Sequence, residues 1–295
     1  MTAIVVLGSA NMDLVVRQPR LPRPGETMFG SAFSTVPGGK GLNQAVAAAR
    51  AGGDVAFLGA IGRDAFGEEL RRCLERDGIA TDALAVVDEP TGTAHISVLD
   101  GGENAIVVVS GANAAITELD ATARRAIEGA RYLVAQFERP IPLITQAFAL
   151  ARDRGIRTVL TPAPVTRVDP GLLDLVDVLV PNAAEASELA GVDDEVEAAR
   201  RLSEQVGLVV MTRGSRGVLV TRAGEVIADL PARSVEAVDT TGAGDTFAGV
   251  LVARLAAGDE LDAALAAAGV AASISVTRHG ASTSMPTWAE ISAAL

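Results

Sequence analysis

Residues 239–246 read Asp-Thr-Thr-Gly-Ala-Gly-Asp-Thr, and the apolar run 247–255 follows them directly. This pattern predicts a loop of small residues that ends where a helix begins. Backbone N–H groups of Gly242, Ala243 and Gly244 can then surround an anion at the positive end of the helix dipole. Asp245 falls in the first helical turn, beside that anion site. The pairing suits phosphoryl transfer, although an ordinary glycine turn with a carboxylate near a helix start gives the same pattern.

The chain before this loop alternates between strand-like and helix-like stretches. Buried strands are predicted at 3–7, 55–60, 83–87, 132–135, 158–160, 176–180 and 208–212. Helical stretches lie between them, and such alternation is typical of right-handed βαβ crossovers. We therefore predict an α/β fold with a central, mostly parallel sheet flanked by helices. A hairpin at 217–221 and 226–230 should add antiparallel strands near one edge.

The first strand is followed by a polar segment, residues 8–13, which reads Gly-Ser-Ala-Asn-Met-Asp. Ligands of an open parallel sheet gather at the carboxyl ends of its strands. Asn11 and Asp13 are therefore candidate ligand contacts. The alternative is an Asx-type turn after the strand.

Two further stretches, at about 14–36 and 91–110, have short β-like pieces interrupted by Pro and Gly. The second stretch reads as two strands around the turn 100–104. Together they are expected to form a small sheet outside the main body, which closes over the site and excludes water. No linker interrupts the chain, so we expect residues 1–295 to form a single domain with this lid.

Composition limits the partners of the protein. The formal net charge is -12 and the single cysteine is Cys73. An acidic chain is a poor ligand for nucleic acid or an acidic membrane surface, although small phosphates can still be held by local amides. One cysteine allows no intrachain disulfide and indicates a reducing compartment. The apolar start is too short for a secretion signal, and no stretch is apolar enough for a membrane span. We expect a cytoplasmic protein.

A second glycine-rich motif, residues 37–44, reads Pro-Gly-Gly-Lys-Gly-Leu-Asn-Gln and leads into an Ala-rich helix. Its glycines allow close approach of the backbone to a ligand, and Lys40 and Asn43 offer donors that suit hydroxyl groups. A glycine turn with a solvated Lys40 is the alternative. The motif is not a Walker A loop, because no Ser or Thr follows the lysine and the glycine spacing differs.

With both motifs in place, the chain resembles the ribokinase/PfkB carbohydrate kinase family. Residues 38–67 are similar to its N-terminal signature and residues 239–251 to its C-terminal one, with further matches at 8–13, 111–114, 136–138, 162–164, 181–185 and 276–281. The resemblance implies ATP-dependent phosphorylation of a sugar, with the 5-hydroxyl of D-ribose as the expected acceptor. Another sugar such as fructose, or a nucleoside, is the alternative substrate. A non-catalytic sugar sensor on the same fold is a further alternative.

The resemblance also implies residue roles. Asp245 would be the catalytic base that receives the proton of the attacking hydroxyl. The sugar pocket would be lined by Asn11, Met12, Asp13, Gly39, Lys40, Gly41, Leu42, Asn43, Glu138 and Asp245. For Glu138, the alternative is a helix N-terminal carboxylate ahead of Pro140.

The nucleotide and its ions would lie on the other side of Asp245. By the resemblance, ATP would contact Asn182, Glu185, Thr212, Arg213, Gly214, Ser215, Arg216, Gly217, Gly242, Ala243, Gly244 and Asp245. Asn182 and Glu185 would help to arrange Mg²⁺, and the alternative is that they cap a helix. For residues 212–217 the alternative is a simple turn into the hairpin. A K⁺ site would involve Asp239, Thr241, Ser275, Arg278, Gly280 and Ser284. The resemblance further implies a homodimer that forms through the lid. Residues 266–270 depart from the family by offering no polar side chain to an adenine.

Overall fold

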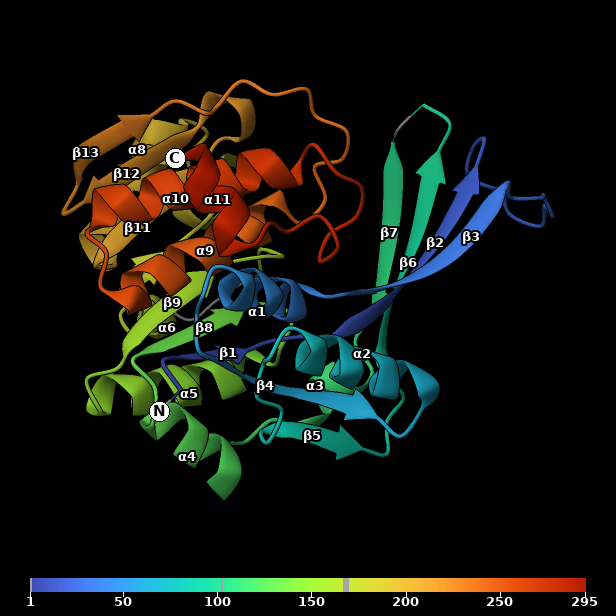
Figure 1. Ribbon diagram of the computed structural model, residues 1–295, viewed down its shortest axis with the longest axis horizontal. Helices are drawn as coiled ribbons and strands as arrows, with labels where there is room; N and C mark the ends of the chain where they lie inside the picture. Colours follow the sequence, from blue (N-terminus) through green and yellow to red (C-terminus); the bar gives the residue numbers. More distant parts are fainter. Residues whose placement is uncertain (1, 102, 167–169) are drawn as a thin grey trace.

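The computed structural model describes residues 2–101, 103–166 and 170–295. A nine-stranded sheet forms the centre of the main body, in the order β13-β12-β11-β10-β9-β8-β1-β4-β5 (Figure 1). Its strands are β1 (Ile4–Leu7), β4 (Val55–Gly62), β5 (Leu84–Val87), β8 (Tyr132–Gln136), β9 (Arg157–Thr161), β10 (Val178–Leu179), β11 (Leu208–Thr212), β12 (Val218–Arg222) and β13 (Glu225–Leu230). The strands from β11 to β5 pair in parallel. The strands β12 and β13 add an antiparallel hairpin at one edge. Both features agree with the sequence prediction of a mostly parallel sheet with an edge hairpin, which is confirmed.

Helices cover both faces of this sheet, which explains why its central strands are continuous apolar runs. All residues of β1 and β4 are buried. Along β1, Ile4 and Val6 belong to one apolar core and Val5 and Leu7 to the other, because successive side chains of a strand point to opposite faces. The molecule therefore has two cores separated by the sheet.

Each core is closed by its own set of helices. One face carries α1 (Lys40–Arg50), α2 (Ala65–Arg76), α9 (Ala243–Ala257), α10 (Leu261–Ser275) and α11 (Trp288–Ala294). The other carries α4 (Ala121–Glu128), α5 (Ile141–Asp153), α6 (Pro170–Leu173), α7 (Ala183–Ala190) and α8 (Glu195–Gln205). Short α3 (Ala112–Ala115) and the 3-10 turn η1 (Gly214–Arg216) complete the element order. Across the described residues, no helix is both long and apolar enough to cross a bilayer.

A separate four-stranded sheet projects from the main body (Figure 1). Its order is β3-β2-β6-β7, with β2 (Asn11–Gln18), β3 (Ala32–Gly38), β6 (Gly92–Leu99) and β7 (Asn104–Val109). The strand β2 pairs antiparallel with β3 and parallel with β6. Residue Gly102 of the expected turn lies outside the described residues. The small sheet expected from the sequence is thus present.

The boundary between the two sheets differs from the sequence expectation. Only residues 8–10 lie between β1 and β2, because β2 already begins at Asn11. Asn11 and Asp13 therefore belong to a strand of the small sheet and not to a polar loop or an Asx-type turn. The reason is tertiary, since Asn11 pairs with Gly38 of β3 and with Gly92 of β6. Any movement of the small sheet would therefore carry these two side chains with it.

Candidate active site

Asp245 occupies the first turn of α9, where the glycine loop ends. The Asn43 amide donates to Oδ2 of Asp245 at 3.1 Å, and the Gln44 amide donates to Oδ1 at 2.9 Å. Both donors lie in the N-terminal half of α1, which also begins after a glycine-rich segment. The two motifs that the sequence singled out, about 200 residues apart, are therefore in direct contact.

A buried chain of hydrogen-bonded amides connects Asp245 to the central sheet. Gln44 also donates through Nε2 to the Thr161 hydroxyl at 2.9 Å, and Gln136 donates to Oε1 of Gln44 at 2.7 Å. Gln136 ends β8 and Thr161 ends β9. The carboxyl ends of two parallel strands thus position Gln44, which in turn orients the Asp245 carboxylate. Most buried polar groups of folded proteins are hydrogen-bonded in this way, although Oε1 of Gln136 has no partner among the described residues.

The glycine loop before α9 has the features of an anion site. Gly242 has φ 75°, a conformation that favours glycine, and a Cβ there would lie 3.1 Å from Ala281. The Ala243 N–H donates to the Thr240 carbonyl at 3.2 Å, which closes the loop on itself. Within the described chain no side chain caps α9, and a Cβ on Gly244 would meet open space. An uncapped helix start with free space leaves N–H groups available to an anion.

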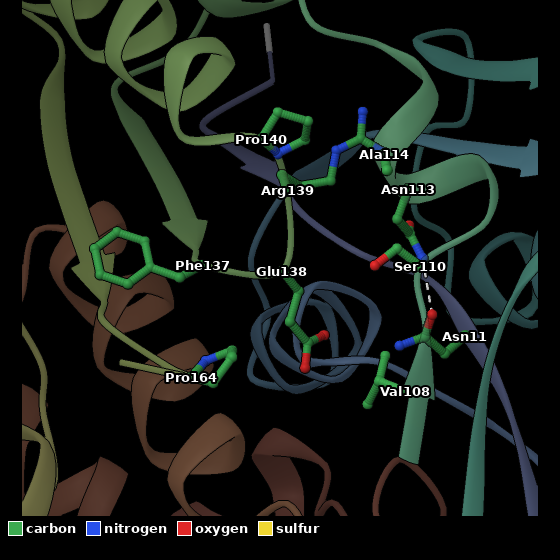
Figure 2. Close-up of a pocket in the computed structure, with 10 residues that line it drawn as sticks. All are labelled: Asn11, Val108, Ser110, Asn113, Ala114, Phe137, Glu138, Arg139, Pro140 and Pro164. Atoms are coloured by element: carbon green, nitrogen blue, oxygen red, sulfur yellow. Dashed lines mark hydrogen bonds between the residues drawn. The ribbon is translucent and has the colours of Figure 1, made fainter. Parts of the chain in front are cut away.

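Asn11 is held in one orientation by Asn113. The Asn113 amide donates to Oδ1 of Asn11 at 2.8 Å and to the Ala10 carbonyl at 3.1 Å, and it accepts from the Ala10 N–H at 3.0 Å. Because its oxygen is occupied, Asn11 offers its amide nitrogen, which points toward Glu138 in Figure 2 (Figure 2). Two residues on, the Asp13 carboxylate lies where a Cβ of Gly38 would fall, 2.3 Å from that Cβ position. Glycine at 38 therefore leaves the space that this carboxylate needs.

Glu138 contacts the start of α1. Its Oε2 accepts the Lys40 N–H at 3.1 Å and the Ser9 hydroxyl. Helix α5 has Pro140 as its N-cap and no side-chain cap, so Glu138 lies ahead of that helix but does not cap it. A carboxylate at the N-terminus of α1 is favoured by the helix dipole. Gly39 has φ 92°, and a Cβ there would lie 2.9 Å from the Asn11 backbone nitrogen.

Three residues expected in the sugar pocket have packing roles in this structure and offer no side chain to a ligand. Met12 and Leu42 place their side chains in the apolar core. Gly41 lies against Gly8, and a Cβ on it would come within 2.5 Å of the Gly8 Cα. Only their backbones remain available to a ligand, and the close approach of residues 8 and 41 brings α1 up to the end of β1.

Several carboxylates share the site with one cation. Burial and the nearby Glu138 and Asp245 raise the pKa of Asp13 to about 7. Burial raises the pKa of Asp245, while Lys40 and the Gln44 and Asn43 amides oppose the rise. For Lys40, burial lowers the pKa, but the carboxylates of Asp245, Glu138 and Glu185 outweigh it and raise the pKa overall. Lys40 thus stays charged, and Asp245 has a greater proton affinity than an ordinary carboxylate, as a general base near neutral pH requires.

Comparison with known proteins matches residues 1–288 to the pfkB family of carbohydrate kinases. The chain belongs to this family. It is 41% identical over 293 residues to a Bacillus subtilis ribokinase, covering 99% of this chain and 98% of that protein. It is 39% identical over 292 residues to a Haemophilus influenzae ribokinase, covering 96% and 95%. The solved structure of Arabidopsis thaliana ribokinase complexed with ribose and ATP is similar to it with a TM-score of 0.94 and 31% identity, covering 99% of this chain and 98% of that one. Both the resemblance and the fold class drawn from the sequence are therefore confirmed.

The Asn-Xaa-Xaa-Glu segment of this pfkB-family chain lies at the start of α7. Asn182 and Glu185 form a reciprocal capping box, with the Glu185 N–H donating to Asn182 at 2.9 Å and the Asn182 N–H donating to Glu185 at 2.8 Å. Burial raises the pKa of Glu185, whereas the Asn182 hydrogen bond and Lys40 oppose the rise. Glu185 therefore belongs electrostatically to the same cluster as Lys40. The structure shows the helix cap, which engages Oε2 of Glu185.

The segment 212–217 turns from β11 through η1 into β12. Arg213 forms an ion pair with Asp229 and lies 3.9 Å from Glu195, and Arg216 pairs with Glu195 at 2.5 Å. Gly214 and Gly217 have φ 56° and 90° and make the turn. The Thr212 hydroxyl donates to the Pro181 carbonyl at 3.4 Å, and Ser215 is exposed. The charged side chains of this segment thus pair with β13 and α8, and most of its backbone N–H groups already donate to main-chain carbonyls.

Of the six positions expected around a monovalent cation, Ser275 ends α10 and the other five lie on adjoining loops. Asp239 accepts the N–H groups of Thr241 and Gly280, each at 2.9 Å, which ties the two loops together. Burial raises the pKa of Asp239, but these hydrogen bonds outweigh it and keep the carboxylate ionised. Ser275 and Ser284 are buried and donate to main-chain carbonyls, and Arg278 pairs with Glu290. Residues 2–101, 103–166 and 170–295 contain no group of three or more His, Cys, Asp or Glu side chains that could hold a metal. The available donors are one carboxylate with carbonyl and hydroxyl oxygens, which suits a weakly charged hard cation.

Sequence reasoning gave no role to Gln44, Gln136, Thr161, Asn113 or Ser9. Each is buried or bonded within the site, and together they fix Asp245, Asn11 and Glu138. Gln44 lies in the glycine motif, and Gln136 and Thr161 end buried apolar strands, so a polar residue at a strand end was the available signal. Their partners could not be read from the sequence, because every one of these bonds joins residues far apart in the chain.

Proposed function

We propose that the protein transfers the terminal phosphoryl group of ATP to the 5-hydroxyl of D-ribose, giving D-ribose 5-phosphate and ADP. The observation that carries this proposal is the position of Asp245, which accepts hydrogen bonds from Asn43 and Gln44 and lies at an uncapped helix start. The likeness to ribokinases over the whole chain supports the same reaction. Asn11, Asp13, Lys40, Asn43 and Glu138 would bind the sugar hydroxyls.

In this mechanism Asp245 takes the proton of the attacking hydroxyl as the new O–P bond forms. Its carboxylate is pinned by Asn43 and Gln44, so little reorganisation is needed at the moment of reaction. The N–H groups at the start of α9 stabilise the charge that develops on the phosphoryl oxygens. The small sheet, residues 14–36 and 91–110, acts as the lid of a single domain and excludes water. Adenine recognition relies on backbone and apolar contacts.

The proposed reaction also involves two ions, Mg²⁺ with the ATP phosphates and K⁺ beside the anion loop. Asn182 and Glu185 would help to hold Mg²⁺ with the ATP phosphates, and this ion supplies charge neutralisation during transfer. Asp239, Thr241, Ser275, Arg278, Gly280 and Ser284 would surround K⁺ beside the anion loop, mostly through carbonyl oxygens. The donor sets fit hard cations because they consist of oxygens. Turnover measured with and without K⁺ tests the second ion, and equal rates would contradict it.

We also propose a homodimer formed through the small sheet. Along β7, Ile106, Val107 and Val109 are exposed, and Phe33 of β3 is 65% exposed. Exposed apolar residues gathered on one small sheet mark an interaction surface. Light scattering that shows only monomer would contradict this assembly.

A cytoplasmic location is proposed from the lone Cys73 and from the dependence on ATP.

The decisive experiment is a coupled assay of ADP release. We expect activity with ribose, and Asp245→Asn should lower kcat by about two to four orders of magnitude, the usual contribution of a general base. Ribose binding measured by calorimetry should persist in that variant. Asp262→Asn, an exposed carboxylate in the first turn of α10, is the matched control. Activity with fructose or adenosine but not with ribose would defeat the substrate assignment, and near-normal turnover of Asp245→Asn would defeat the mechanism.

A further inference from the structure

A cavity of about 350 Å³ adjoins the proposed sugar site (Figure 2). It shares Asn11 and Glu138 with that site, but its walls do not include Asp245 or the glycine loop before α9. The remaining walls are Val108 of the small sheet, Ser110, Asn113, Ala114, Phe137, Arg139, Pro140 and Pro164. This volume is in the range of small-molecule sites. The cavity therefore extends the sugar site away from the position of phosphoryl transfer.

Among the wall residues that the structure describes, Arg139 is the cationic one. It is only 4% exposed, and its Nε and Nη1 atoms are buried without a hydrogen-bond partner in the described part of the chain. No carboxylate of the described residues forms an ion pair with it. In Figure 2 its side chain extends past Ala114, on the side of the backbone away from the Glu138 carboxylate. Burial alone accounts for the lowering of its pKa to about 10, so no charge on the described residues compensates it.

An uncompensated buried guanidinium is costly to the folded state. Buried charges in proteins are normally paired, because desolvation is repaid only by a counter-charge with good hydrogen-bond geometry. The guanidinium group also presents donors in a rigid fork that matches the two oxygens of a carboxylate or phosphate. A partner of that kind would neutralise the charge.

Other donors line the same cavity. The oxygen of Asn11 is occupied by Asn113, so the Asn11 nitrogen is available, and the Ser110 side chain is also part of the wall. Glu138 is the one carboxylate in the lining, and its Oε2 already accepts from Ser9 and from the Lys40 N–H. The cavity thus has hydrogen-bond donors on Arg139, Asn11 and Ser110, and its acceptor is the Glu138 carboxylate, which it shares with the proposed sugar site.

We propose that Arg139 forms an oxyanion subsite at the end of the sugar pocket, which binds a carboxylate or phosphate group. The group could be carried by a sugar derivative, in which case the inference rests on the proposed function, or it could be a free inorganic anion that binds beside the sugar. The chemistry is the same for both sources, and a titration can separate them.

Isothermal titration calorimetry of the purified protein tests the subsite without turnover. One arm titrates inorganic phosphate into protein saturated with a non-hydrolysable ATP analogue, whose terminal phosphate occupies the glycine loop. The other arm titrates D-ribonate, which carries a carboxylate at C1, and compares it with D-ribose. The variants are Arg139→Gln, Arg139→Lys and the control Arg200→Gln, an exposed arginine of α8.

We expect Arg139→Gln to weaken binding of at least one of these anions by about tenfold or more, the usual effect of losing a charged hydrogen-bond partner. Arg139→Lys should retain part of the affinity, and Arg200→Gln should bind like the wild type. An effect confined to ribonate identifies a sugar-borne group, and an effect on phosphate identifies a free anion. If Arg139→Gln binds both anions as tightly as the wild type, or if the wild type binds neither, the subsite does not exist. Because ribose affinity and ADP release are measured separately, failure of the subsite leaves the proposed function intact.

A stability measurement separates this subsite from a purely structural role. Arg139→Met keeps much of the side-chain volume and removes the charge. Without added anion, its thermal midpoint should equal or exceed that of the wild type, because an unpaired buried charge has been removed. A large fall in the midpoint would show that the guanidinium has a structural partner and would overturn the proposal.

Discussion

Replacing Gln44 by Met would test whether the buried amide chain positions Asp245. Methionine is similar in length and has no hydrogen-bonding amide. The change removes the 2.9 Å bond from Gln44 to Asp245, the 2.9 Å bond to Thr161 and the 2.7 Å bond from Gln136. Gln44 is 1% exposed, so water cannot easily replace these partners. Asn43 would remain the one side chain of α1 that donates to Asp245.

The magnitudes follow from these contacts. A hydrogen bond to a charged group contributes about 1.5–3 kcal/mol, and a buried donor left without an acceptor costs about 1–3 kcal/mol. In the variant, the charged Asp245 carboxylate loses a hydrogen bond, and the buried Gln136 amide is left without an acceptor. We expect the free energy of unfolding to fall by about 2–5 kcal/mol. Because this bond orients the carboxylate toward the attacking hydroxyl, its loss should misplace the base and lower kcat by about tenfold to a hundredfold.

The pH dependence gives an independent readout. The Gln44 hydrogen bond lowers the pKa of Asp245, so its loss should raise that pKa. A base must be ionised to act, and therefore the acidic limb of kcat/KM should move to higher pH. The measurements are urea unfolding and ADP release across a pH series, with Gln146→Met on the outer part of α5 as control. An unchanged pH profile with unchanged kcat would refute the positioning role of Gln44.

Two further predictions concern the surroundings of the site. Gly41→Ala should destabilise the protein by about 1–3 kcal/mol or more, because its Cβ would lie 2.5 Å from the Gly8 Cα, where only backbone could move. Gly129→Ala, whose Cβ would meet nothing closer than 3.6 Å, is the control in thermal denaturation, and equal stabilities would contradict the packing argument. The Asp13 pKa of about 7 lies above its ordinary value, so this group stabilises the folded state at low pH and that contribution is lost as the pH rises toward and through about 7. Asp13→Asn should flatten this part of the urea-unfolding profile, and an identical slope in wild type and variant would count against the burial of Asp13.

The candidate site was partly accessible from the sequence. Glycine loops and helix starts are local features, so the motifs at 37–44 and 239–246 predicted Lys40, Asn43 and Asp245 as neighbours of a ligand. The contact between Asn43 and Asp245 was not local, and it depends on α1 and α9 packing on the same face of the sheet. The assignment of Asn11 to a strand also depended on a distant partner, Gly38. Residue-by-residue roles in binding remain predictions.

The amino-acid sequence alone determined the α/β class, the parallel core and the small second sheet, because hydrophobic periodicity and glycine placement act over short stretches of chain. Tertiary structure decided which polar side chains meet. Gln44, Gln136 and Thr161 join through bonds that span tens to about a hundred residues, and the isolation of Arg139 is visible only when all its neighbours are known. The energy of a buried polar group depends on partners that the fold alone supplies, and therefore charge and hydrogen bonding at this site could not be derived from local sequence.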